Sequence, residues 1–183
     1  MLTTWLNTRP ELDYQREVSI ADTDGTTAPS GFFQMKFSTR IDRHVPAEQL
    51  FDAIGDFDAL ERTLISRGAS VMRIDPAKDP GTAKGWQIGF DWRGRPRMMK
   101  LVVTRYDRPE ALAMQGRSDA LDLTVNATVV ALNRAKSRLI FELEVRPRNM
   151  KARLMLQTAK LGKAQLDKRF ERRIGEYLDL MQR

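Results

Sequence analysis

Few side chains in this sequence could carry out catalysis or bind a metal. The chain has 183 residues, no cysteine and one histidine, His44. This composition excludes a thiol nucleophile, a disulfide, cysteine-ligated zinc and an imidazole cluster. His44 follows a predicted strand without an evident acid–base partner, so we expect a surface residue. No GxGxxG, Walker A, HExxH or GxSxG pattern occurs, and we predict no metal and no cofactor. The sequence leaves open whether the protein is an enzyme.

A few basic side chains could instead hold an anionic ligand. Arg93, Arg95 and Arg97 cluster around a predicted hairpin turn, and guanidinium groups can pair with phosphate or carboxylate. The alternative is that these arginines are solvated, as is common at tight turns. Lys163, near the centre of an apolar helical stripe, could hold an acidic head group or extend to water past the sheet edge.

Two tryptophans are candidates for stacking on a flat ligand. Trp86 and Trp92 occupy alternate positions of one predicted strand, on its apolar face. Aromatic residues at the strand period belong to the core more often than to a binding site. Both interpretations predict that the two side chains are buried.

Hydrophobic periodicity predicts the elements that must position these side chains. Short helices are indicated over residues 47–54 and 57–66, and a period of two indicates strands elsewhere. The connections between most strands are short, which predicts antiparallel neighbours. The predicted strands cover residues 33–41, 69–74, 86–92, 98–106, 112–116, 121–131 and 139–145.

One long helix is predicted from the N-cap residue Asn149 to about Gln182. The side chains of its apolar stripe are mostly small in the first half of the helix and bulky in the second half. A ligand could therefore lie between the small side chains and the sheet. In that case Gly162→Leu should shrink the cavity and lower ligand affinity. The alternative is that large sheet residues fill the space as a solid core. The stripe consists of Ala152, Met155, Ala159, Gly162, Leu166, Phe170, Ile174, Tyr177 and Met181.

Charge and composition separate residues 1–32 from the rest of the chain. This segment has two basic and five acidic residues, for a charge of −3, whereas residues 33–183 have 29 basic and 19 acidic, for +10. We predict a flexible N-terminal extension over residues 1–32 and one domain over residues 33–183. The alternative is that translation starts at Met35, in which case the first 34 residues result from the choice of start site. The N-terminal residues lack a signal-peptide pattern, which predicts a cytoplasmic protein.

Three stretches carry a resemblance to a known family. They are residues 35–57, with MKFSTR leading into VPAEQLFDAIGDF; residues 86–94, WQIGFDWRG; and residues 145–154, from VRPR to KARL. Over about residues 33–183 the chain resembles the SRPBCC (START-like, helix-grip) superfamily, which includes polyketide cyclases and lipid-transfer proteins. The resemblance implies an α+β helix-grip fold, in which a curved antiparallel sheet of about seven strands wraps around a long C-terminal helix. Two short helices follow the first strand.

The resemblance implies binding of an apolar molecule between sheet and helix, but it transfers no catalytic motif. We expect non-catalytic binding of a hydrophobic small molecule or lipid. The first alternative is an interaction module that docks on the ribosome or an anionic membrane through its basic face. The second is a cyclase- or lyase-type enzyme acting on a polyketide-like substrate. The oligomeric state stays open. The expected ligand-contacting residues are Trp86, Phe90, Trp92, Met99, Met114, Leu123, Val125, Leu143, Met155, Ala159, Gly162 and Leu166.

Overall fold

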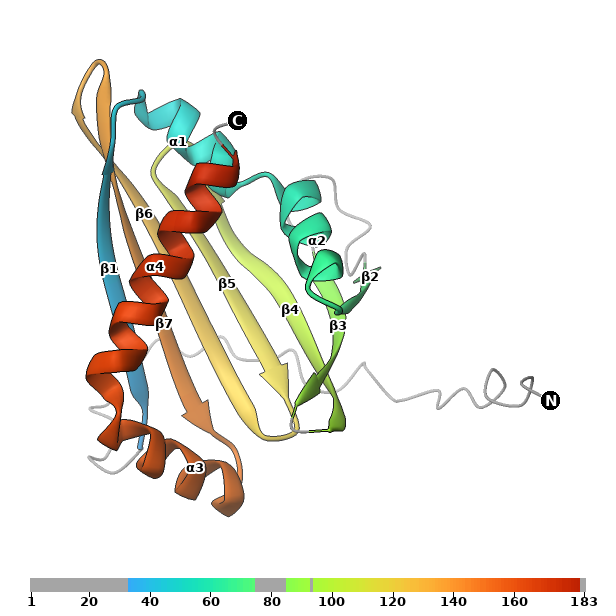
Figure 1. The fold of residues 1–183 in the computed structure, drawn as a ribbon. Coiled ribbons are helices and arrows are strands. Elements are labelled where there is room, and N and C mark those ends of the chain that lie inside the picture. The colour runs from blue at the N-terminus through green and yellow to red at the C-terminus, as the bar shows by residue number, and fades with distance from the viewer. Residues whose placement is uncertain (1–32, 75–84, 93, 182–183) are drawn as a thin grey trace, which may run out of the picture. The chain divides into compact units, whose positions relative to one another are not determined.

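A computed structural model describes residues 33–74, 85–92 and 94–181. The predicted extension over residues 1–32 and the loop expected at 75–81 lie outside the described residues. The described part folds into one antiparallel sheet and four helices (Figure 1). Its element order is the one predicted, except at the C-terminal helix.

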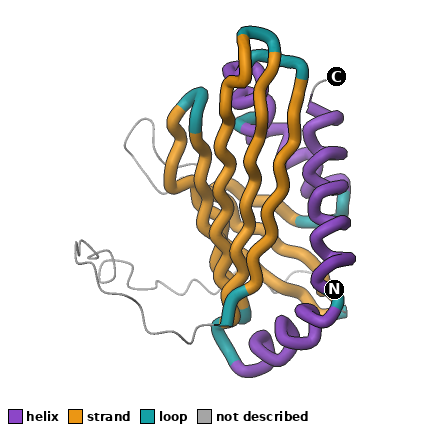
Figure 2. Tube along the Cα trace, turned by 90° about the vertical axis from the view of Figure 1, so that its left-hand side faces the viewer, coloured by secondary structure: helices purple, strands orange, loops and turns teal. Residues whose placement is uncertain are grey.

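Seven strands form the sheet, in the order β1-β7-β6-β5-β4-β3-β2. Each strand is antiparallel to its neighbours, which confirms the expectation from the short turns. Figure 2 shows the strands bending together, with α4 running along one side of the sheet. The strands are β1 (Met35–Arg43), β2 (Ser70–Ile74), β3 (Gly85–Trp92), β4 (Arg95–Asp107), β5 (Ala111–Ser118), β6 (Leu121–Asn133) and β7 (Lys136–Pro147).

Two short helices follow β1 with the predicted bounds, α1 (Ala47–Ile54) and α2 (Phe57–Ser66). α1 buries Leu50 and Phe51 completely, as its apolar face predicts. α2 begins at Asp56, whose side chain accepts a hydrogen bond from the Ala59 backbone N–H at 2.9 Å. This N-cap satisfies a backbone donor that the first helical turn leaves without a partner.

The C-terminal helix is interrupted, so the prediction of one continuous helix was wrong. The chain forms α3 (Met150–Leu161) and α4 (Lys163–Met181), with Gly162 between them. The predicted N-cap is confirmed, because Asn149 Oδ1 accepts from the Ala152 backbone N–H at 2.8 Å. Figure 1 shows that α3 and α4 run in different directions. The apolar stripe is therefore divided between two helices.

The buried side chains form two hydrophobic clusters. The larger cluster lies between the sheet, α1, α2 and the last turns of α4, and includes Phe51, Trp86 and Leu178. The smaller cluster joins Met35 on β1 and Val145 on β7 to α3. None of the described helices combines the length and the apolar character that crossing a bilayer requires.

Candidate functional site

α4 packs against β1 and β7, on one side of the sheet. The ring of Phe170 on α4 lies 5.4 Å from that of Phe37 on β1 and 5.8 Å from that of Phe141 on β7, between centroids. Lys163 at the start of α4 pairs with Asp167 at 2.7 Å, and its Nζ lies 5.3 Å from the centre of the Phe37 ring. Lys163 therefore already has an acidic partner and an aromatic neighbour.

α2 covers the beginning of β3. The rings of Phe57 and Trp86 lie 5.1 Å apart, and Trp86 Nε1 donates a hydrogen bond to Glu61 at 2.5 Å. Burial alone would raise the pKa of Glu61, but hydrogen bonds from Arg73 and Trp86 hold this pKa below its usual value. Trp86 is 1% exposed and belongs to the core.

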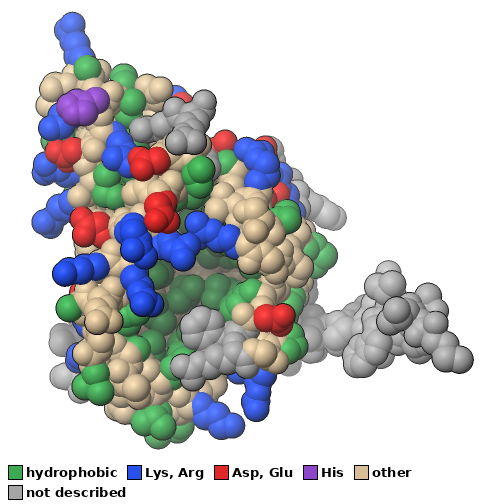
Figure 3. Space-filling model, in the orientation of Figure 1, with side chains coloured by type: hydrophobic (Ala, Val, Ile, Leu, Met, Phe, Trp, Pro, Cys, Tyr) green, Lys and Arg blue, Asp and Glu red, His purple; other side chains and the backbone are tan. Residues whose placement is uncertain are grey.

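A cavity of about 770 Å³ lies over the sheet beyond the parts that α2 and α4 cover. Small-molecule sites typically have volumes of about 300–1,000 Å³. Figure 3 shows a hollow with hydrophobic side chains on its floor and Lys and Arg side chains along its edge. The β3–β4 hairpin, the β5–β6 turn and the start of α3 line the cavity through Phe90, Arg95, Arg97, Met98, Met99, Ser118, Asp119, Ala120, Leu121, Asn149, Lys151, Ala152 and Met155.

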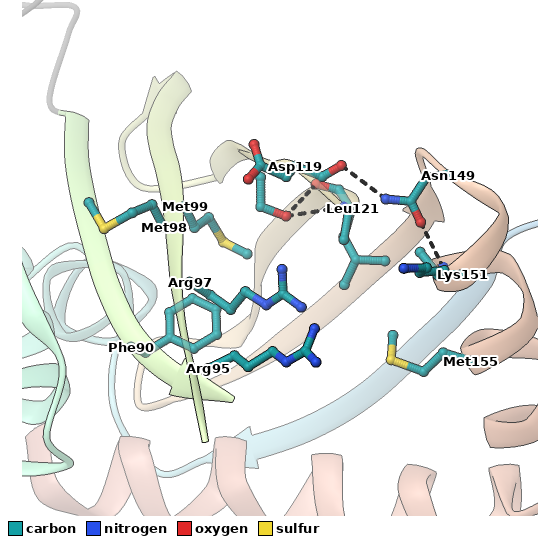
Figure 4. Close-up of a pocket in the computed structure, with 13 residues that line it drawn as sticks. Phe90, Arg95, Arg97, Met98, Met99, Asp119, Leu121, Asn149, Lys151 and Met155 are labelled. Atoms are coloured by element: carbon teal, nitrogen blue, oxygen red, sulfur yellow. Dashed lines mark hydrogen bonds between the residues drawn. The ribbon is translucent and has the colours of Figure 1, made fainter. Parts of the chain in front are cut away.

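The apolar part of this lining comes from three separate segments. Phe90 on β3 and Met99 on β4 lie on the sheet side, whereas Met155 projects from α3 (Figure 4). Leu121, at the start of β6, lies between them in the same view. All four side chains are half-buried, so an apolar ligand in the cavity would cover surface that is now partly exposed to water.

The cationic part of the lining is a pair of arginines on β4. Successive residues of a strand point to opposite faces, so Arg95 and Arg97 share the face of Met99. In Figure 4 both side chains extend from β4 toward Leu121 and Met155. Within the described segments, neither guanidinium has an ion pair or a hydrogen bond to protein.

The wall opposite the arginines is fixed by hydrogen bonds. Ser118 Oγ accepts from the Leu121 backbone N–H at 3.1 Å, and Arg148 donates to the Ser118 carbonyl at 2.6 Å. Asn149, which caps α3, also donates through Nδ2 to the Asp119 carbonyl at 3.3 Å. The β5–β6 turn and the first turn of α3 are therefore held together as one wall.

The residues predicted to contact a ligand lie in several different environments. Phe90, Met99 and Met155 line the cavity together. Trp86, Met114 and Val125 are buried in the larger cluster, and Leu143 packs against both clusters. Leu123, Ala159 and Leu166 pack on the smaller cluster, Gly162 is exposed at the helix break, and the Trp92 side chain lies outside the described residues.

Several cavity residues were not predicted from the sequence to contact a ligand. Arg95 and Arg97 were considered only as a possible anion-pairing cluster, although their alternation with Met99 already placed them on the apolar face. Ser118, Asp119, Leu121 and the other residues of the β5–β6 turn gave no comparable signal. Their approach to α3 depends on the tertiary fold.

The remaining candidate residues lie elsewhere. His44 is exposed at the turn between β1 and α1, as expected. Across residues 33–74, 85–92 and 94–181, no group of three or more His, Cys, Asp or Glu side chains could hold a metal ion. Among the described residues, the cavity brings together predicted ligand-contacting side chains from β3, β4 and α3 that are not fully buried in the core.

Solved structures with the same fold include enzymes. An aromatase/cyclase from Streptomyces sp. R1128 is 10% identical, with a TM-score of 0.58, and the match covers 82% of this chain and 95% of that one. For a protein from Thermus thermophilus the identity is 11%, the TM-score 0.59 and the coverage 80% and 97%. A point mutant of norcoclaurine synthase from Thalictrum flavum, solved with a transition-state analogue, is 12% identical, with a TM-score of 0.54 and coverage of 70% and 84%.

No protein-family model and no curated protein sequence matches the chain. The relationship therefore rests on structure, and at this level of identity it establishes the fold alone. The seven-stranded antiparallel sheet, the two short helices after β1 and the C-terminal helices of this chain are consistent with a helix-grip fold. The chain therefore has the helix-grip fold.

Proposed function

We propose that this protein binds a hydrophobic small molecule or lipid in the cavity between the sheet and α3. The observation that carries the proposal is a cavity of about 770 Å³ that Phe90, Met99 and Met155 line from separate segments. Covering apolar surface stabilises a complex by about 25 cal/mol per Å² before the costs of association. The norcoclaurine synthase structure, which contains a transition-state analogue, supports the capacity of this fold to hold a small molecule.

Binding without catalysis is the better supported form of this proposal. Asp119 is the one carboxylate among the described residues that line the cavity, and it is exposed. General acid–base catalysis needs a positioned group whose pKa suits proton transfer, which favours buried or paired side chains. The alternative is a cyclase- or lyase-type reaction with Asp119 as the proton-transferring group. A pH-dependent turnover that Asp119→Asn abolishes would favour that alternative.

The binding proposal can be tested with the neutral fluorescent probe Nile red. We expect wild-type protein to bind the probe and Met155→Trp, which fills the cavity, to weaken binding at least about tenfold. Leu154→Trp is the matched control, because Leu154 lies on the same helix but is 66% exposed and outside the cavity. Equal affinity for all three proteins, or no binding to wild type, would contradict the proposal.

The outer face of α3 favours a second function, docking on an anionic membrane surface. Met150, Leu154 and Leu161 are 75%, 66% and 90% exposed. At 100° per residue these three positions fall within about 40° of one another around the helix. Lys151 lies on one side of this stripe and Arg153 on the other, and the sequence of α3 contains no acidic residue. Apolar side chains flanked by cations are typical of helices that lie in a membrane interface.

Vesicle co-sedimentation tests this second function. We expect binding to vesicles of phosphatidylcholine with phosphatidylglycerol, weaker binding to phosphatidylcholine alone, and loss of binding as salt rises. Leu154→Ser with Leu161→Ser should weaken binding to the anionic vesicles. Ile65→Ser, which changes an exposed apolar residue on α2, is the control and should bind as wild type does. Equal binding by the double variant and wild type would exclude α3 as the docking surface.

A further inference from the structure

We infer that the ligand carries an oxyanion, a carboxylate or a phosphate, which Arg95 and Arg97 bind at one end of the cavity. The inference rests on the proposed binding of an apolar molecule in this cavity and adds the chemistry of its polar end. The ligand class is an amphipathic acid, with an apolar body on Phe90, Met99 and Met155.

The position of the arginines is the first observation that supports an anion site. Arg97 pairs with Phe90 across the β3–β4 ladder, and the alternation along β4 places Arg95 on the same face. Figure 4 shows both guanidinium groups extending from β4 across the cavity. A guanidinium presents donors in a rigid planar fork that fits two oxygens of a carboxylate or phosphate.

The second observation is that no described carboxylate neutralises these two cavity arginines, whereas three other arginines of the sheet and its turns are paired with acids. Arg73 pairs with Glu61 and Asp58, Arg108 pairs with Asp52, and Arg138 pairs with Asp42. Of the residues that the structure describes, none forms an ion pair or hydrogen bond with Arg95 or Arg97. Arg95 is exposed and Arg97 is half-buried, and an anion between these two adjacent cations would offset their mutual repulsion.

The opposite wall contributes one cation, Lys151, beside one carboxylate, Asp119. Lys151 lines the cavity from the first turn of α3, a helix of 12 residues with no acidic residue in that turn. The N-terminal end of a helix carries a partial positive charge and favours nearby anions. Asp119, also part of the lining, has no ion pair with either arginine within the described residues. Cationic groups therefore lie on both sides of the cavity.

The experiment compares ligands that share an apolar chain and differ in the head group. Calorimetric titrations at fixed ionic strength would use dodecanoate, dodecyl phosphate, dodecanol and inorganic phosphate, below the micelle concentrations. We expect wild type to bind at least one of the two amphipathic acids about tenfold or more tightly than dodecanol, because charge-assisted hydrogen bonds add to apolar burial. The comparison of dodecanoate with dodecyl phosphate shows which oxyanion is preferred.

Two variants make the result specific to the cavity. The double variant Arg95→Gln with Arg97→Gln should lose the preference for the acid while still binding dodecanol. Arg134→Gln, at the exposed β6–β7 turn, is the control and should keep the preference. Equal affinities of wild type for acids and alcohol would overturn the anion site and leave apolar binding intact. Inorganic phosphate binding as tightly as dodecyl phosphate would overturn the amphipathic ligand, and absence of all binding would overturn both proposals.

Discussion

Phe90 on β3 and Arg97 on β4 occupy paired positions in the sheet, and both side chains line the same cavity. An aromatic ring and a guanidinium group are therefore neighbours on the face that also carries Arg95 and Met99. This arrangement arises because α4 packs on β1 and β7 while α2 covers the beginning of β3. The cavity lies over the end of β3 and the start of β4, with α3 on its far side (Figure 4).

Gly162→Leu should leave ligand affinity unchanged, contrary to the expectation from the sequence. Gly162 is exposed between α3 and α4, and a Cβ added there would meet only the Ala159 carbonyl oxygen, at 3.9 Å. The backbone angle φ is −102°, which other residues adopt without strain, so we expect the unfolding free energy to change by less than about 1 kcal/mol. Nile red titration and urea unfolding measure the two quantities. A loss of affinity as large as that of Met155→Trp would place the ligand against Gly162.

Trp86→Phe should lower stability without changing ligand binding. The substitution removes the hydrogen bond from Nε1 to Glu61 and leaves space beside Phe57. We expect a loss of about 1–3 kcal/mol in unfolding free energy. Because Trp86 lies in the core under α2, the affinity for Nile red should change less than about twofold. A folded variant with strongly reduced affinity would show that the ligand reaches Trp86.

Asp42 should make stability depend on pH in the acid range. Hydrogen bonds from Arg138 and Lys136, together with their charges, outweigh partial burial and lower the pKa of Asp42 from 3.8 to about 2. A carboxyl group with a lowered pKa in the folded state stabilises the protein above its unfolded pKa, and this contribution is lost as the pH falls through the folded value. The contribution of Asp42 is therefore present above about pH 4 and lost by about pH 2.

The measurement is urea unfolding of wild type and Asp42→Asn across this range. The difference in unfolding free energy should be largest above about pH 4 and shrink toward about pH 2. Glu142→Gln is the control, because it removes a carboxylate from an exposed position of β7 and shows how the unfolding free energy responds to losing a surface carboxylate on the sheet. A difference between wild type and Asp42→Asn that stays constant with pH would show that the ion pair with Arg138 does not stabilise the fold.

Much of the fold could be predicted because each element carries a local signal. The alternation of Phe37, Thr39 and Ile41 predicts β1, and the apolar faces of residues 47–54 and 57–66 predict both short helices within their observed bounds. The break at Gly162 was not predicted, because apolar residues recur at intervals of three and four positions both before and after it. Glycine is the common residue at helix C-termini, so its presence there was the available signal.

The cavity could be predicted only in part. Phe90, Met99 and Met155 were selected because the helix-grip arrangement places strand and helix residues opposite one another. The sequence could not show that α4 packs on β1 and β7, since that depends on where the chain turns after α3. It also could not bring the β5–β6 turn beside Asn149, because that contact joins residues 30 positions apart.

The most direct test of ligand binding is native mass spectrometry of the full chain immediately after purification, followed by solvent extraction of any bound molecule. We expect a stoichiometric adduct that dissociates on denaturation, and extraction of an apolar molecule with an acidic group. Met155→Trp should carry less of this adduct than Leu154→Trp. A protein that has only the mass of its chain, and that gains no mass when exposed to fatty acids and other apolar molecules, would contradict ligand binding in the cavity.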